Sequence, residues 1–98
     1  MEDPVRRDLQ RIERALPGMV PPPLRAAGVA FRCVHRAATS RRPPRYRVIA
    51  AWTEDHPRPG RRADRARTSI HIEDPDADLL LERLPEFLES LRFFIDSE

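Results

Sequence analysis

Cys33 and His35 are the side chains of this chain best placed for covalent chemistry. They lie two residues apart in the segment GVAFRCVHRA, and residues so spaced share one face of a β-strand. A thiol beside an imidazole is the pairing of a cysteine nucleophile with its general base. The same face also carries Val29 and Phe31, so the pattern favours a small buried cysteine beside a peripheral histidine. We therefore expect a protein that catalyses nothing.

Metal binding is the second chemistry to consider, because three aspartates alternate before the last apolar segment: Asp74, Asp76 and Asp78. Alternating aspartates begin calcium-binding loops, but Pro75 and the leucines at 79–81 depart from that pattern. An Asp-Pro pair followed by further acids is typical of a helix N-terminus, where carboxylates face the positive end of the helix dipole. The histidines are too scattered to complete a site. The sequence predicts helix capping here, with no metal and no cofactor.

Positive charge is the third candidate feature, and it is unevenly distributed. Residues 1–20 carry four arginines and four acids, residues 21–67 twelve arginines and three acids, and residues 68–98 two arginines and nine acids. The chain contains no lysine, which fits codon bias in a GC-rich bacterial or phage genome. The positions of the arginines are therefore better evidence of an anion-binding surface than their number. Such asymmetry indicates an anionic partner or self-association.

The most basic stretch is HPRPGRRADRAR, residues 56–67, which holds five arginines and one acid. Its prolines and glycine, and the length of the connection from Glu54 to Ala66, predict a mobile loop. Arginines on such a loop would raise the rate of encounter with negative surfaces without specifying one.

Two helices flank the central part of the chain. The first is predicted over residues 3–16, with Asp3 as its cap, and Pro17 and Gly18 end it. Its apolar residues follow helical spacing: Val5, Leu9, Ile12 and Leu16. The following GMVPPPL predicts an extended polyproline connection. The last helix is predicted over residues 75–95, with a kink or break near Pro85, where a second helix could begin.

Three alternating segments between these helices predict strands over residues 28–37, 45–53 and 67–73. One domain, residues 1–98, is expected, because a chain this short supports a single core. The fold class is α+β: a two-layer sandwich in the order α-β-β-β-α, with a three-stranded antiparallel meander and both helices on one face. No run suits a membrane span or a secretory signal, so we expect a cytoplasmic protein.

The uncovered face of this sheet and its loops form the predicted binding surface. We expect it to use ten arginines: Arg32, Arg36, Arg41, Arg42, Arg47, Arg58, Arg61, Arg62, Arg65 and Arg67. Val34 and Ile49 add apolar surface to the same face, which is typical of a protein-interaction surface. The expected partner is an anionic protein surface, a second copy of this chain in a homodimer included. The alternative is a monomer whose exposed apolar residues are ordinary surface residues.

Nucleic acid is the runner-up partner, because arginine-rich loops beside a basic sheet supply phosphate contacts. The aromatic residues Phe31, Tyr46 and Trp52 fall on the inward face. No stacking platform is then left outside, so any nucleic-acid binding is expected to be electrostatic and weakly sequence-selective.

Overall fold

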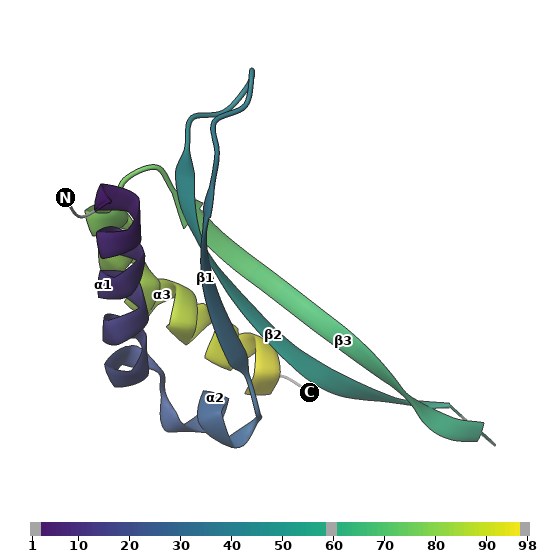
Figure 1. Cartoon of the computed structure of the whole chain (residues 1–98). Helices are drawn as coiled ribbons and strands as arrows, with labels where there is room; N and C mark the ends of the chain where they lie inside the picture. Colours follow the sequence, from purple (N-terminus) through teal and green to yellow (C-terminus); the bar gives the residue numbers. More distant parts are fainter. Residues whose placement is uncertain (1–2, 59–60, 97–98) are drawn as a thin grey trace.

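The helices lie on one side of a three-stranded sheet, which makes an α+β fold (Figure 1). The computed structural model describes the backbone of residues 3–58 and 61–96 and the side chains of residues 3–53 and 67–95. In order, its elements are α1 (Pro4–Met19), α2 (Pro22–Ala26), β1 (Ala30–Arg36), β2 (Arg45–Arg58), β3 (Arg61–Asp74) and α3 (Ala77–Asp96). The strands pair antiparallel in the order β1-β2-β3. The predicted fold class is confirmed.

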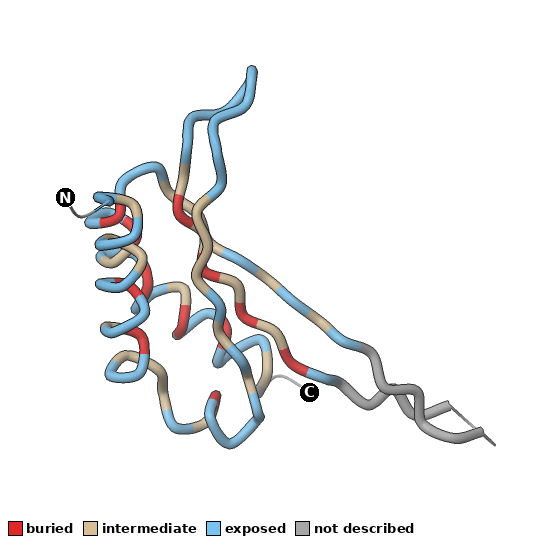
Figure 2. The backbone as a smooth tube through the Cα atoms, viewed as in Figure 1, coloured by how far each residue is buried: buried red, intermediate tan, exposed pale blue. Residues whose placement is uncertain are grey.

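Apolar side chains on one face of the sheet pack against α1 and α3. Alternate residues of β2 supply the centre of this inner face and are buried: Tyr46, Val48, Ala50 and Trp52. One cluster joins Tyr46 and Val48 to α1 and the first half of α3. A second joins Ala50 and Trp52 to α2 and the second half of α3. Buried residues therefore gather between the two layers (Figure 2).

Helix α1 begins as predicted but ends later. The Asp3 carboxylate accepts the backbone N–H of Val5 at 3.0 Å, which caps the first turn. The helix passes through Pro17 and ends at Met19, so the predicted end before Pro17 is wrong. Proline removes only one hydrogen bond, and the extra turn lets Met19 pack against both clusters.

The predicted polyproline connection is also wrong over most of its length. Pro21 is extended, but Pro22 and Pro23 begin α2, in the first turn, where a missing N–H breaks no bond. This short helix places Leu24 in the second cluster, where it is fully buried. Gly28 then turns the chain into β1 with a φ of 74°, a conformation that favours glycine.

Strands β2 and β3 extend beyond the body of the protein as a two-stranded arm (Figure 1). Ala30 of β1 pairs with Ala51, so the rest of β2 pairs with β3 alone. The predicted mobile loop from Glu54 to Ala66 is wrong, because β2 runs to Arg58 and β3 starts at Arg61. Proline is tolerated where a strand has one free edge, and the register is irregular next to Pro57, between His56 and Arg58. The arm makes the molecule long, 58 × 32 × 21 Å.

Helix α3 is continuous from Ala77 to Asp96 with Pro85 inside it. The predicted alternative of a separate helix starting at Pro85 is therefore wrong, whereas the kink stays a prediction. Pro85 lies on the exposed side of the helix. The buried stripe, Leu80, Leu84, Leu88 and Leu91, continues past it on the other side.

A polar relay ties the two layers together near the start of α1. The Tyr46 hydroxyl donates to Asp8 at 3.0 Å, and Arg11 bridges Asp8 at 3.1 Å and Asp78 of α3 at 2.6 Å. Burial, and then the hydrogen bond and charge of Asp8, raise the pKa of Tyr46 to about 12. The relay therefore connects the sheet, α1 and α3 through side chains alone.

Candidate functional site

The outer face of the sheet, which points away from the helices, carries most of the predicted binding residues that the structure describes. The strand register places Arg32, Ile49 and His71 in one row across the sheet. The next row contains Val34, Arg47 and Glu73. Arg32, Arg36 and Arg67 are exposed, as predicted, whereas Arg47 is half-buried.

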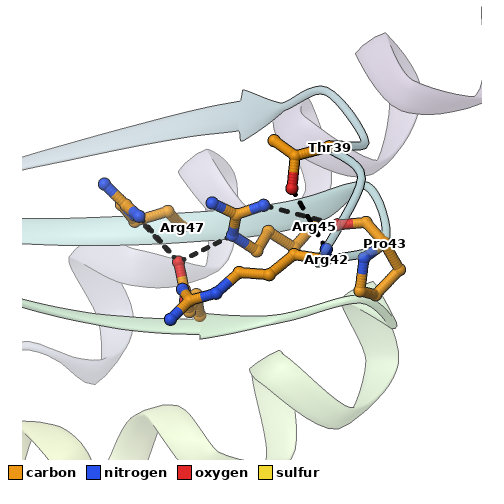
Figure 3. A network of polar contacts seen from close by, with 6 residues as sticks. Thr39, Arg42, Pro43, Arg45 and Arg47 are labelled. Atoms are coloured by element: carbon orange, nitrogen blue, oxygen red, sulfur yellow. Dashed lines mark hydrogen bonds and ion pairs between the residues drawn. The ribbon is translucent and has the colours of Figure 1, made fainter.

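Three arginines converge on the single carboxylate of Glu73 (Figure 3). Arg42 Nη1 donates to Oε1 at 2.9 Å, and Arg45 Nε donates to Oε2 at 3.0 Å. Arg47 donates to the same Oε2 through Nε at 3.0 Å and Nη2 at 2.9 Å. Three guanidinium groups and one carboxylate leave this Glu73 cluster with a net charge of +2.

The Glu73 cluster is held in a fixed geometry. The hydrogen bonds from Arg47, and after them the one from Arg45, keep the pKa of Glu73 below its ordinary value, although partial desolvation acts to raise it. The Thr39 hydroxyl accepts the backbone N–H groups of Arg41 and Arg42, and thereby shapes the turn that carries Arg42. Arg42 has the most exposed side chain of the three arginines, at 60%, so it is the one most available to an incoming anion.

A hollow lies on the outer face, closer to the arm. Its volume is about 340 Å³, and Ile49 and Ala51 contribute apolar lining. Arg32 of β1 and Arg67 of β3 line the same hollow from opposite strands. The hollow thus combines apolar surface with two guanidinium groups that have no counter-charge among the side chains lining it.

The ten predicted arginines therefore fall into four sets. Arg42 and Arg47 belong to the Glu73 cluster, and Arg32 and Arg67 line the hollow. Arg36 and Arg41 are exposed near the cluster end of the sheet. The side chains of four others lie outside the described residues: Arg58, Arg61, Arg62 and Arg65.

Sequence reasoning missed Arg45, whose side chain is only 11% exposed. Strand alternation could have found it, because Arg45 lies two residues before Arg47 and so shares its face. The same alternation along β3 places Glu73 on the outer face, but its role as the shared counter-charge was not foreseen. Alternation assigns a face to a residue and does not identify its partner.

The Cys33 and His35 pair has little nucleophilic character. Burial, and secondarily the charge of Glu13, raise the pKa of Cys33 to about 11, so its thiol is protonated at neutral pH. The His35 ring packs edge-on against Tyr46, with ring centroids 4.9 Å apart. Thiolate is the reactive form of cysteine, so this environment opposes attack on a substrate.

The acidic run before α3 caps the helix, as predicted. Asp76 Oδ1 accepts the N–H of Asp78 at 2.8 Å, and Asp74 Oδ1 accepts the N–H of Asp76 at 2.9 Å. Among the residues that the structure describes, no group of three or more potential ligands is arranged to hold a metal ion.

Comparisons with family models, curated proteins and solved structures find no match to this chain. No helix in the described ranges is both long enough and apolar enough to cross a membrane.

Proposed function

We propose that this chain is a non-catalytic interaction module that binds an acidic protein surface on the outer face of its sheet. The observation that carries the proposal is the hollow, in which Ile49 and Ala51 lie beside Arg32 and Arg67. Apolar surface at the centre of a contact excludes water, and charges at its rim select and orient the partner. An acidic protein with an apolar patch matches both features.

Face-to-face pairing of two copies is less favourable than binding a different protein. It would bring the positive Glu73 cluster, Arg32 and Arg36 of each copy toward their equivalents. Like charges brought together across an interface oppose association. The half-buried free thiol of Cys33 suits a reducing compartment, so we place the interaction in the cytoplasm of the producing cell.

Photocrosslinking from the outer face tests the proposal. The variant Ile49→p-benzoylphenylalanine is irradiated in an extract of the producing cells, with the exposed position Ser90 of α3 as the matched control. We expect a covalent adduct with an acidic protein from position 49 and none from position 90. Equal adducts from both positions would overturn the proposal, and so would an adduct that nuclease destroys. An adduct between two copies of this chain would overturn the choice of a different protein as the partner.

Charge reversal tests the electrostatic part of the proposal. The double variant Arg32→Glu with Arg67→Glu is expected to reduce the yield of the adduct from position 49 at least about tenfold, the loss of roughly 1.4 kcal/mol of binding free energy. Arg6→Glu with Arg14→Glu changes the net charge equally on exposed positions of α1 and is expected to leave the yield unchanged. Equal losses from both double variants would mean that only net charge matters.

Nucleic acid stays a second candidate because the arm is a two-stranded ribbon. A ribbon of this kind fits the major groove of DNA, and residues 58–67 of the arm contain five arginines. A gel-shift series with a twenty-base-pair duplex tests this function. Retention that falls steeply as salt rises would support it, whereas no retention at low salt would exclude it.

A further inference from the structure

A groove of about 760 Å³ runs beside β1, on the side away from β2. Its lining comes from α1, from the segment around α2 and from β1 itself. Leu16, Val20 and Phe31 contribute apolar surface, and Glu13 and Arg25 contribute charge. Pockets of this volume can enclose several side chains of a ligand.

The backbone next to this groove is unpaired. β1 occupies one edge of the sheet and pairs only with β2. Within the described ranges, the seven residues Ala30–Arg36 make no backbone hydrogen bond across their other edge. An edge of this kind can accept another extended chain, whose main chain supplies affinity while its alternate side chains supply specificity.

The side chains of β1 specify what that extended chain should look like. Phe31 and Cys33 line the groove on the inner side, whereas Arg32 and Arg36 are exposed on the outer side. A strand added to this edge would send alternate side chains to the same two sides. Its inward row must be apolar to fill the groove, and its outward row must be acidic to match the arginines.

We infer that the edge of β1 binds an extended segment of the partner in which apolar and acidic residues alternate. The inference rests on the proposed function, since the acidic row would lie beside the outer face. Arg32 lines both the groove and the outer-face hollow, so one partner can occupy both surfaces around the same edge. A second copy paired through β1 fits less well, because Arg32 and Arg36 of both copies would crowd one side of the joined sheet.

Titration of the isotope-labelled chain with a nine-residue peptide of alternating valine and glutamate tests the inference by NMR. We expect shifted resonances and slowed amide exchange at residues 30–36, with the β3 edge unaffected. Shifts centred on β3 or α3, or unchanged amide exchange at residues 30–36, would overturn the inference.

Methylation of the peptide nitrogens supplies the sharper control. Alternate N–H groups of a strand point to the same edge, so methylating all valine nitrogens blocks one edge and methylating all glutamate nitrogens blocks the other. One methylated peptide is expected to lose at least about tenfold in affinity, and the other is expected to bind as the parent does. Equal losses would mean that the peptide binds by its side chains without joining the sheet.

A charge exchange identifies the arginines that are involved. The variant Arg32→Glu with Arg36→Glu should lose the valine-glutamate peptide and bind a valine-lysine peptide instead, and failure to exchange preference would overturn the assigned orientation. If photocrosslinking from position 49 gives the adduct but the peptide does not bind at β1, this inference alone is overturned. If photocrosslinking from position 49 gives no adduct, the proposed function is overturned.

Discussion

At the scale of single residues, Glu73 has the most connected role in the described part of the molecule, because it is the shared counter-charge of Arg42, Arg45 and Arg47. Hydrogen bonds to an ionised carboxylate favour its charged form. The carboxylate therefore stabilises the fold and, at the same time, reduces the positive charge that a partner meets. Removing the carboxylate should therefore lower the stability of the fold and increase the positive charge that a partner meets.

We predict that Glu73→Gln lowers stability at neutral pH and that the difference from the parent chain shrinks in acid. The pKa of Glu73 is lower in the folded protein than its ordinary value, so its contribution is complete above the unfolded pKa of about 4.3 and is lost as the pH falls through the folded pKa. Urea unfolding at pH 7 and at pH 3 measures the difference. The exposed Glu89→Gln on α3 is the control, and a Glu73→Gln effect equal at both pH values would contradict the assignment.

Residue types and alternation predicted which arginines occupy the outer face but not how they are paired. Arg32 and Arg36 were assigned to that face from their position in β1, and both are exposed there. Arg47 has the same alternation but is held against Glu73, its direct partner on the neighbouring strand β3. Cross-strand partners depend on the register, which the sequence does not specify when a connection of unknown shape separates the strands.

At the scale of secondary structure, the prolines account for most differences between expectation and structure. Pro17, Pro22 and Pro57 were each taken to interrupt or prevent regular structure, yet each lies within a helix or strand. Proline destabilises a helix or strand only where its missing N–H removes a hydrogen bond or where its ring clashes with the neighbouring backbone. The first helical turn at Pro22 and the free strand edge at Pro57 avoid these costs, whereas Pro17 lies inside α1 and removes one hydrogen bond there. The sequence alone does not show where the edges lie.

The two glycines of the described helices and turns should respond oppositely to the same substitution. Gly28→Ala is expected to destabilise by about 1 kcal/mol, because its φ of 74° suits glycine. Gly18→Ala lies within α1 and should stabilise by about 0.5–1 kcal/mol, because alanine is the better helix former. An added methyl group meets nothing within 4 Å at either position, so packing does not confuse the comparison.

Denaturant unfolding of both variants measures these effects. Changes of the same sign would show that the φ value at Gly28 does not govern the outcome.

At the scale of the whole molecule, the arm makes the protein longer than a compact chain of the same number of residues. The Cα radius of gyration is 15.9 Å, whereas a compact chain of about 100 residues has about 13 Å. Among the side chains that the structure describes, Trp52 is the last residue of β2 in the buried clusters. Beyond Ala51, β2 pairs with β3 alone, so this part of the hairpin adds length to the molecule.

We predict that replacing residues 55–65 with Asn-Gly, a favoured two-residue hairpin turn, shortens the molecule without unfolding it. Glu54 pairs with Ala66, so the new turn would close the hairpin at that pair. Small-angle X-ray scattering should show the radius of gyration falling toward about 13 Å, while the thermal midpoint stays within a few degrees. A large fall in the midpoint would mean that the arm supports the body.

The relay of Tyr46, Asp8, Arg11 and Asp78 adds ion pairs to the buried cluster at one end of the helix layer, whereas Leu24, Trp52, Leu88 and Leu91 hold the other end by burial. Dissolved sodium sulfate screens exposed ion pairs and strengthens apolar association. Its effect on apolar association acts at both ends, whereas screening acts only on the relay. Sulfate would therefore strengthen the Leu24 end more than the relay end, so solvent composition changes the relative stability of the two ends.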